Sequence, residues 1–214
     1  SKLLEHRCDA FVCSELVGAP CQAACPVGTE AWRYVAHIAR GELEEAYRVI
    51  RSANPFPSVC ARACDHPCES HCRAASNGTS PVAIRALKRF VTDRVDPATW
   101  VPERRPWGGE RQPRVAVVGS GPAGLTAAHQ LALEGVAVTV LEADPEPGGM
   151  LYCAIPTYRL PRETVRSEVE ALLVEGIEMR CSTALGTDLT VDDLFDEGFD
   201  AVLLAIGAHA SRPL

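Results

Sequence analysis

The sequence predicts an α+β chain in which an all-helical, cysteine-rich domain precedes part of a parallel α/β domain. Eight of the ten cysteines lie within the first 72 residues. The same region carries apolar residues at three- and four-residue spacing, which is typical of amphipathic helices. Beyond residue 113, strand-like and helix-like segments alternate, as they do in α/β layer folds. We therefore predict a helical domain at 1–96, a linker at 97–113 and an α/β region at 114–214.

Three longer helices are expected in the first domain. Segments 30–39, 42–51 and 82–95 have the helical pattern, and Gly41 and the Asn54-Pro55-Phe56-Pro57 stretch separate them. The linker sequence, DPATWVPERRPWGGERQP, contains four prolines and two glycines. These residues disfavour a regular helix or strand, so the segment should be irregular.

The length and charge of the chain restrict its class. With 214 residues it has room for two modest domains. A formal net charge of -7 argues against nucleic acid or an anionic membrane as a partner. No apolar run approaches the roughly 18 to 20 residues that cross a bilayer, so we expect no membrane insertion. Free thiols favour a reducing cytoplasm. Because the chain starts at Ser1, a fragment of a longer protein is one interpretation.

The eight N-terminal cysteines are the candidate metal ligands. Pro26 follows the last cysteine of the first group, as in ferredoxin-type runs whose thiolates hold cubane clusters. Eight thiolates suit two [4Fe-4S] clusters. In the second group each step of four residues advances about 40° around a helix, and Pro67 interrupts it, so each cluster should draw on both groups. The groups are Cys8, Cys13, Cys21 and Cys25, then Cys60, Cys64, Cys68 and Cys72.

Other interpretations of the cysteines are weaker. A secreted disulfide scaffold is usually shorter and follows a signal peptide, and structural zinc usually shows paired C-x2-C spacing. Buried inert thiols suit the isolated Cys153 and Cys181, not eight clustered cysteines. His66 and His71 would suit a Rieske-type centre, but enough thiolates are already present and His-Pro fits a turn.

Residues 114–142 have the order of a dinucleotide-binding unit. A buried-strand pattern runs into a glycine turn and a helix, and a second strand at 136–141 ends on Glu142. Gly119 permits the tight turn, Gly121 lets the backbone approach a pyrophosphate, and Gly124 lets helix and strand pack closely. Glu142 would accept hydrogen bonds from ribose hydroxyls. The turn itself is Gly119-Ser120-Gly121-Pro122-Ala123-Gly124.

Several long motifs between residues 8 and 96 resemble one known family. CQAACP, NPFPSVCARACDHPCESHCR and PVAIRALKRF are similar to the two-cluster domain of the glutamate synthase small subunit and of dihydropyrimidine dehydrogenase. The resemblance implies crossed ligation, with one cluster on Cys8, Cys13, Cys21 and Cys72, and three ligands of the other at Cys25, Cys64 and Cys68.

The chain departs from the family at two places. The first cysteine spacing is stretched to C-x4-C-x7-C, and EHRCDAFVC also resembles the flavin-bearing subunit of NADH-dehydrogenase-like and hydrogenase-like complexes. In relatives the fourth ligand of the second cluster is a glutamate or glutamine on the following helix. Lys88 stands at the matching position, and its ammonium is a poor ligand. Cys60 is the candidate replacement.

The second half resembles the FAD-binding half of the same family through EADPEPGGM and IPTYRLPR. The resemblance implies that Gly149 and Met150 follow the flavin's phosphate and ribitol, that Arg159 contacts the cofactor, and that Leu185 lies beside adenine. AVLLAIGAH resembles the strand and turn before an inserted NAD(P)H-binding domain, which is absent from this chain. No residue has the pattern of a catalytic nucleophile, so chemistry would belong to cofactors.

The resemblance implies a helical domain with two [4Fe-4S] clusters and the first half of a Rossmann-like FAD-binding domain. Such a chain would be an electron-transfer module of an NAD(P)H-dependent oxidoreductase, incomplete as given. Electrons would pass from NAD(P)H through FAD and the clusters to another redox subunit. Relatives serve a glutamate synthase large subunit, a hydrogenase, a formate dehydrogenase or an NADH-dehydrogenase-like complex. The alternative is a non-catalytic, cluster-carrying connector subunit.

Overall fold

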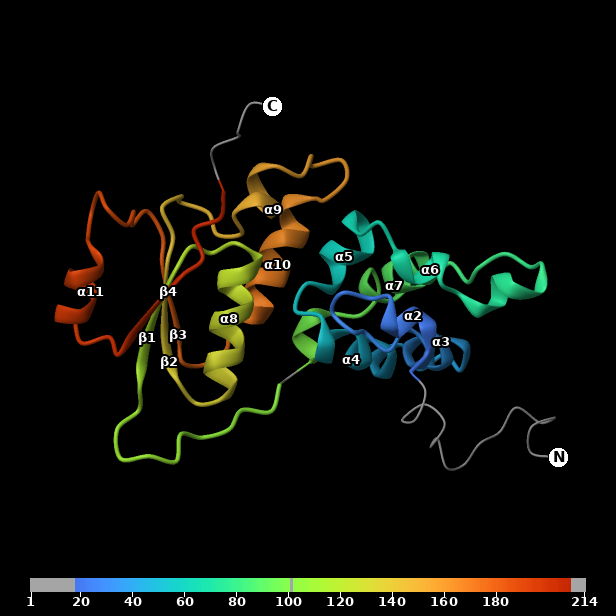
Figure 1. Cartoon of the computed structure of the whole chain (residues 1–214), viewed down its shortest axis with the longest axis horizontal. Helices are drawn as coiled ribbons and strands as arrows, with labels where there is room; N and C mark the ends of the chain where they lie inside the picture. Colours follow the sequence, from blue (N-terminus) through green and yellow to red (C-terminus); the bar gives the residue numbers. More distant parts are fainter. Residues whose placement is uncertain (1–17, 101, 209–214) are drawn as a thin grey trace. The chain divides into compact units, whose positions relative to one another are not determined.

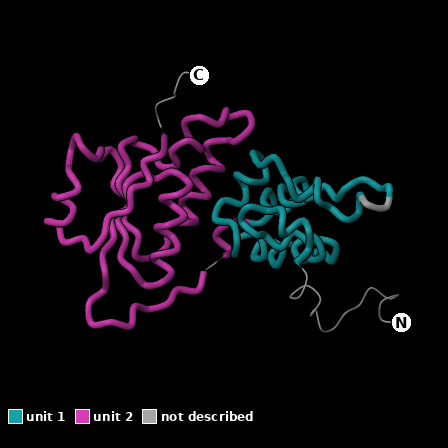
Figure 2. The backbone as a smooth tube through the Cα atoms, viewed as in Figure 1, with its two compact units in different colours: residues 1–95 teal, residues 96–214 magenta. Residues whose placement is uncertain are grey.

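The computed structural model describes residues 18–100 and 102–208 (Figure 1). The chain divides into two compact units, Ser1–Val95 and Asp96–Leu214 (Figure 2). Among the described residues, no helix is both long enough and apolar enough to span a membrane.

The described part of the first unit is helical, as predicted. The expected helices at 30–39, 42–51 and 82–95 are present as α3, α4 and α7, and short helices that the periodicity did not predict lie between them. In sequence order the elements are α2 (Pro20–Ala23), α3 (Ala31–Ala39), α4 (Leu43–Ala53), α5 (Pro57–Ala63), α6 (Pro67–Ser70), the 3-10 helix η1 (Arg73–Asn77) and α7 (Ile84–Thr92).

Two tyrosines and an isoleucine anchor the core of this unit. Tyr34 of α3 and Tyr47 and Ile50 of α4 are almost completely buried where the two helices pack together. The Tyr34 hydroxyl donates a hydrogen bond to the carbonyl of Ile84, 3.3 Å away at the start of α7. Burial of the rings and this long-range bond fix α7 against α3, and α7 carries one wall of the site described below.

The second unit is built on a four-stranded parallel sheet in the order β3-β2-β1-β4. The predicted small α/β domain, partial and Rossmann-like, is therefore confirmed. Its elements are η2 (Pro97–Thr99), β1 (Arg114–Val118), α8 (Pro122–Leu133), β2 (Ala137–Leu141), α9 (Met150–Cys153), α10 (Arg162–Leu172), β3 (Ile177–Arg180), α11 (Val191–Asp196) and β4 (Ala201–Leu204).

Helices cover both faces of this sheet (Figure 1). Val117 of β1 packs in one cluster with Ala128 of α8, whereas Ala116 and Val118 pack in another with Leu194 of α11. Successive residues of a strand point to opposite faces, so β1 must be apolar from Val115 to Val118 to satisfy both layers. This explains why the strand reads as a continuous apolar run.

The proline-rich segment before β1 is attached to the second unit. The Arg105 N–H donates to the carbonyl of Leu133 at 2.7 Å, and the Gln112 side chain donates to the carbonyl of Gly135, also at 2.7 Å. The Trp100 and His129 rings lie 5.9 Å apart. Apart from η2 the described residues of the segment are irregular, and they satisfy one carbonyl at the end of α8 and one just beyond it.

Candidate functional site

Four cysteines from two distant segments line one small cavity in the first unit. Cys25 follows α2 and Cys60 lies in α5. Cys64 comes directly after α5, and Cys68 lies in α6. Lys88 and Arg85 of α7 complete the wall. The cysteines that line it are Cys25, Cys60, Cys64 and Cys68.

The remaining predicted ligands lie elsewhere. Cys21 is in α2 and Cys72 follows α6, and these two short helices pack against each other. Neither cysteine lines the cavity. Cys8 and Cys13 lie outside the described residues, so the ligand set implied for the first cluster stays a prediction.

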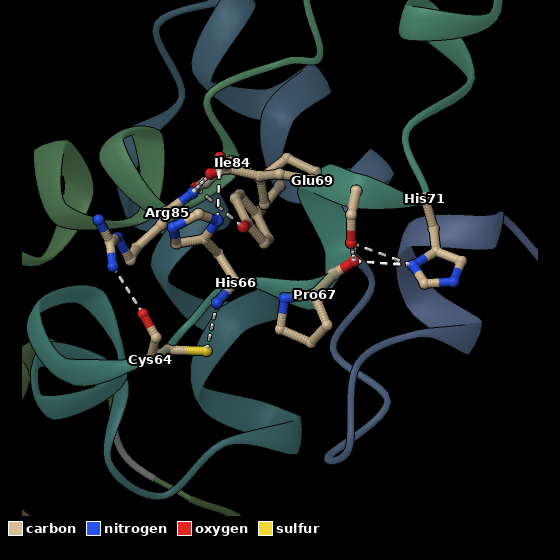
Figure 3. A network of polar contacts seen from close by, with 9 residues as sticks. Cys64, His66, Pro67, Glu69, His71, Ile84 and Arg85 are labelled. Carbon is tan, nitrogen blue, oxygen red and sulfur yellow. Dashed lines mark hydrogen bonds and ion pairs between the residues drawn. The ribbon is translucent and has the colours of Figure 1, made fainter.

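The break between α5 and α6 places Cys60, Cys64 and Cys68 around one cavity, although they are spaced four residues apart. Helix α5 ends at Ala63, the next residue Cys64 has an extended backbone, and Pro67 begins α6. Between them His66 adopts a left-handed conformation with φ 51°, which directs its N–H to the sulfur of Cys64 at 3.3 Å (Figure 3). The predicted interruption at Pro67 is confirmed, and it removes these cysteines from one straight helix.

Polar contacts hold this turn against α7 (Figure 3). Arg85 donates from its guanidinium to the Cys64 carbonyl at 2.7 Å, and its N–H donates to the Glu69 carboxylate at 2.8 Å. The same carboxylate lies 3.3 Å from the His66 ring. His71 donates to the Pro67 carbonyl at 2.9 Å. Both histidines therefore have structural partners, which favours the turn interpretation over a Rieske-type centre.

The thiols on the two sides of the cavity differ in acidity. Burial raises the pKa of Cys25, but hydrogen bonds from the N–H groups of Thr29 and Val27 outweigh it and hold this pKa below its ordinary value. The Lys88 charge adds to the lowering of the Cys25 pKa. Burial raises the pKa of Cys68 to about 11, and Lys88 opposes that rise. A cation thus faces thiols that must lose protons to bind a metal.

The cavity suits a cluster by its donor chemistry, because thiols from distant parts of the chain line it together. No three His, Cys, Asp or Glu side chains in the described ranges converge on a single metal ion. In a cubane the thiolates are spread over several irons. Cluster binding and the final packing of this unit should therefore be coupled.

A larger cavity of about 410 Å³ lies in the second unit, where β1, β2 and β4 end and α8 begins. Eight of the predicted nucleotide-site residues line it. They are Gly119, Gly121, Pro122, Ala123, Glu142, Gly149, Met150 and Leu185. Parallel strands open such a crevice at their carboxyl ends, where ligands of α/β sheets bind.

The glycines of the turn have different surroundings. A Cβ at Gly119 would lie 2.4 Å from the carbonyl oxygen of Ala205, and one at Gly124 would lie 1.9 Å from that of Gly119. Around Gly121 nothing lies within 4 Å of the position of a Cβ. Two glycines therefore permit backbone packing, and the third faces the open space in which a pyrophosphate would fit.

Glu142 is held by the glycine turn itself. Its carboxylate accepts hydrogen bonds from the Ser120 N–H at 2.8 Å, from the Ser120 hydroxyl, and from the Asp144 N–H at 2.9 Å. Burial raises the pKa of Glu142, but these bonds outweigh it and hold the pKa below its ordinary value. Because each carboxylate oxygen accepts two hydrogen bonds, a ribose hydroxyl can still bind.

Three predicted residues lie outside this cavity wall. Ser120 is fully buried beneath the turn, Gly124 packs against Gly119, and the side chain of Arg159 is exposed. The contact of Arg159 with a cofactor stays a prediction. Asp144 and Thr183 also line the cavity, although neither was predicted as a site residue. The Thr183 N–H donates to the Glu142 carbonyl at 2.8 Å, a contact between distant segments that no local pattern signals.

We expect Glu142→Gln to destabilise the second unit at neutral pH by about 1–3 kcal/mol, because a charged acceptor of three hydrogen bonds is lost. The folded-state pKa of Glu142 is lowered, so its stabilisation is complete above the unfolded pKa of about 4.3 and disappears as the pH falls through the folded value. Urea unfolding at about pH 7 and about pH 3 should show the difference from wild type closing in acid. The exposed Glu175→Gln serves as control, and a difference independent of pH would contradict the prediction.

Comparison with known proteins matches each unit to a family. Residues 4–100 match the family described as dihydropyrimidine dehydrogenase domain II, 4Fe-4S cluster. Residues 117–173 match the NAD(P)-binding Rossmann-like domain. The chain therefore combines a 4Fe-4S domain with a dinucleotide-binding domain.

Individual relatives match most of this chain. The NADP(+)-dependent formate dehydrogenase subunit beta of Moorella thermoacetica is 40% identical, over 91% of this chain and 30% of the relative. The glutamate synthase [NADPH] small chain of Bacillus subtilis is 35% identical, over 90% and 38%. The NAD-dependent dihydropyrimidine dehydrogenase subunit PreT of Escherichia coli K12 is 35% identical, over 92% and 47%.

These matches confirm the resemblance predicted from the motifs: the chain is similar to the glutamate synthase small chain and to the dihydropyrimidine dehydrogenase proteins. It spans between 30% and 47% of the length of the three relatives.

Proposed function

We propose that the chain is the electron-transfer part of an NAD(P)H-dependent oxidoreductase that contains FAD and two [4Fe-4S] clusters. The observation that carries this proposal is the cavity at which Cys25, Cys60, Cys64 and Cys68 meet, in a region that matches a 4Fe-4S family. The adjoining Rossmann-like unit supports a dinucleotide as the electron source.

The residues of the first unit would hold the two clusters. The cysteines of the cavity are the proposed ligands of one, and Cys8, Cys13, Cys21 and Cys72 of the other. Lys88 and Arg85 lie in the cavity wall, where their charge offsets that of the thiolates. Lys88 has no acceptor chemistry, which supports Cys60 as the fourth ligand.

The residues of the second unit would bind FAD along the glycine turn. Gly121 leaves room for the pyrophosphate at the start of α8, where backbone N–H groups and the helix dipole favour negative charge. Glu142 would orient the ribose, and Gly149, Met150 and Leu185 would follow the rest of the nucleotide. When bound, FAD would supply the chemistry of hydride acceptance from NAD(P)H and of one-electron transfer toward the clusters.

The partner would be another redox subunit. Two of the relatives are named as subunits, of a formate dehydrogenase and of a dihydropyrimidine dehydrogenase, and a third as the small chain of glutamate synthase. This chain would feed electrons to a comparable subunit. Free thiol ligands and oxygen-sensitive clusters favour a reducing cytoplasm.

The complete protein, purified without oxygen, should contain about eight irons and about eight acid-labile sulfides per chain, because two cubanes require that number. NADH or NADPH should then reduce both clusters, as measured by EPR. Stoichiometric zinc without sulfide would contradict the cluster assignment. Clusters that dithionite reduces but neither nucleotide reduces would indicate the connector subunit instead.

A further inference from the structure

Two buried polar groups next to the cysteine cavity lack hydrogen-bond partners. The side chains of Thr29 and Asn54 are in residues only 1% and 2% exposed. Within the described residues, the Thr29 hydroxyl and the Asn54 amide nitrogen have no hydrogen-bond partner. A buried donor without a partner destabilises the fold, so each such group calls for an explanation.

Thr29 lies beside Cys25. The chain turns tightly after Cys25, whose carbonyl accepts from the Gly28 N–H at 2.9 Å, and this turn returns Thr29 to the sulfur. The Thr29 N–H hydrogen-bonds the Cys25 sulfur, which holds Thr29 on this turn next to the cysteine. The Thr29 hydroxyl is buried there and has no partner among the described residues.

Asn54 lies beside Cys60, which belongs to the second of the two chain segments that line the cavity. Its side-chain oxygen accepts from the Phe56 N–H at 3.0 Å and from the Cys60 thiol at 3.7 Å, and the second of these bonds is lost when the thiol loses its proton. The backbone contact fixes the orientation of the amide, since an N–H donor must face the oxygen and not the nitrogen. The nitrogen is then the end without a partner. A thiol that has lost its proton to a metal no longer donates and becomes an acceptor.

We propose that the Thr29 hydroxyl and the Asn54 amide nitrogen donate hydrogen bonds to sulfur atoms of the [4Fe-4S] cluster bound by Cys25, Cys60, Cys64 and Cys68, and thereby raise its reduction potential. The inference rests on the proposed function, which supplies the cluster. The sulfur atoms of this cluster would accept hydrogen bonds from two donors that have no partner within the described protein. One donor lies next to Cys25 and the other next to Cys60. Hydrogen bonds to cluster sulfurs are a main determinant of the potential, because they stabilise the more negative, reduced form.

The test is an EPR-monitored redox titration of the complete, cluster-loaded protein. Thr29→Val keeps the shape of the side chain and removes the donor, whereas Thr29→Ser keeps the hydroxyl. At a fixed ambient potential we expect Thr29→Val to lower the ratio of reduced to oxidised cluster by about tenfold, which is about 59 mV for a one-electron couple. Thr29→Ser should match wild type. The other cluster should keep its potential in both variants.

Asn54→Asp provides a second test that does not depend on how Thr29→Val folds. An aspartate retains an oxygen for the Phe56 N–H and removes the nitrogen donor, so the potential of the same cluster should again fall. The inference alone would be overturned if wild type, Thr29→Val and Asn54→Asp had full iron and sulfide and equal potentials. The two donors would then be assigned to hydrogen bonds with buried water. A wild-type protein without iron and sulfide would overturn the proposed function and the inference together.

Discussion

Cys60→Ala should remove one of the two clusters, so that iron and sulfide fall from about eight to about four per chain. The expectation follows from the cavity that Cys60 shares with Cys25, Cys64 and Cys68. No other side chain in that wall replaces it, because Lys88 and Arg85 are cations and His66 is engaged by Glu69. Conversion to a three-iron form, seen by its own EPR signal, would have the same meaning.

Two control variants accompany this measurement. Lys88→Ala should leave the EPR signals of both clusters in place, since an ammonium does not bind iron. Cys181→Ala removes a thiol of the second unit that lies outside both cysteine groups, and the iron content should not change. A Cys60→Ala protein with full iron, full sulfide and an unchanged spectrum would assign this thiol to packing.

Gly124→Ala and Gly121→Ala should separate folding from nucleotide binding. An added methyl at Gly124 would lie 1.9 Å from the Gly119 carbonyl oxygen, so α8 must move away from β1. We expect the free energy of unfolding of the second unit to fall by about 3 kcal/mol. At Gly121 the backbone has φ -67° and the methyl meets nothing, so stability should stay near wild type.

The same methyl at Gly121 enters the space in which the pyrophosphate would lie. Flavin content after gel filtration of the complete protein should therefore fall strongly in Gly121→Ala, although urea unfolding followed by circular dichroism shows a normal transition. Full flavin retention in Gly121→Ala would contradict the proposed path of the cofactor. Wild-type stability of Gly124→Ala would contradict the packing explanation.

The longer elements of the fold were predictable because their signals are local. Helices α3, α4 and α7 each repeat apolar residues over at least nine positions, and β1 runs directly into the glycine turn. The short helices α5 and α6 were not predicted because each is at most seven residues long and begins with proline, which reads as a break. Pairing of β4 with β1 joins residues more than eighty positions apart, and no periodicity encodes it.

The site was predictable in its chemistry and not in its surroundings. Cysteine type and spacing indicated thiolate ligands, but the spacing did not show that Cys60 shares a cavity wall with Cys25 and Cys68, because that depends on the turn at His66 and Pro67. Thr29 and Asn54 had no signal of their own. A threonine before a helix resembles an ordinary cap, and an asparagine before Pro55 resembles an ordinary turn.

The entry of the cavity's cysteines from two distant segments has a consequence for biosynthesis. During translation Cys25 leaves the ribosome well before Cys68, by roughly 2 to 9 seconds at about 5–20 residues per second. In that interval the early thiol has no cavity to complete, and helices α3 and α4 lie in the loop that joins the two segments. A cluster that binds after Cys68 has been synthesised would close this loop. It would reduce the conformational entropy of the loop in the unfolded chain, as a crosslink does. The supply of iron and sulfide would then set when this half of the protein becomes resistant to proteolysis, whereas the Rossmann-like half would mature independently of it.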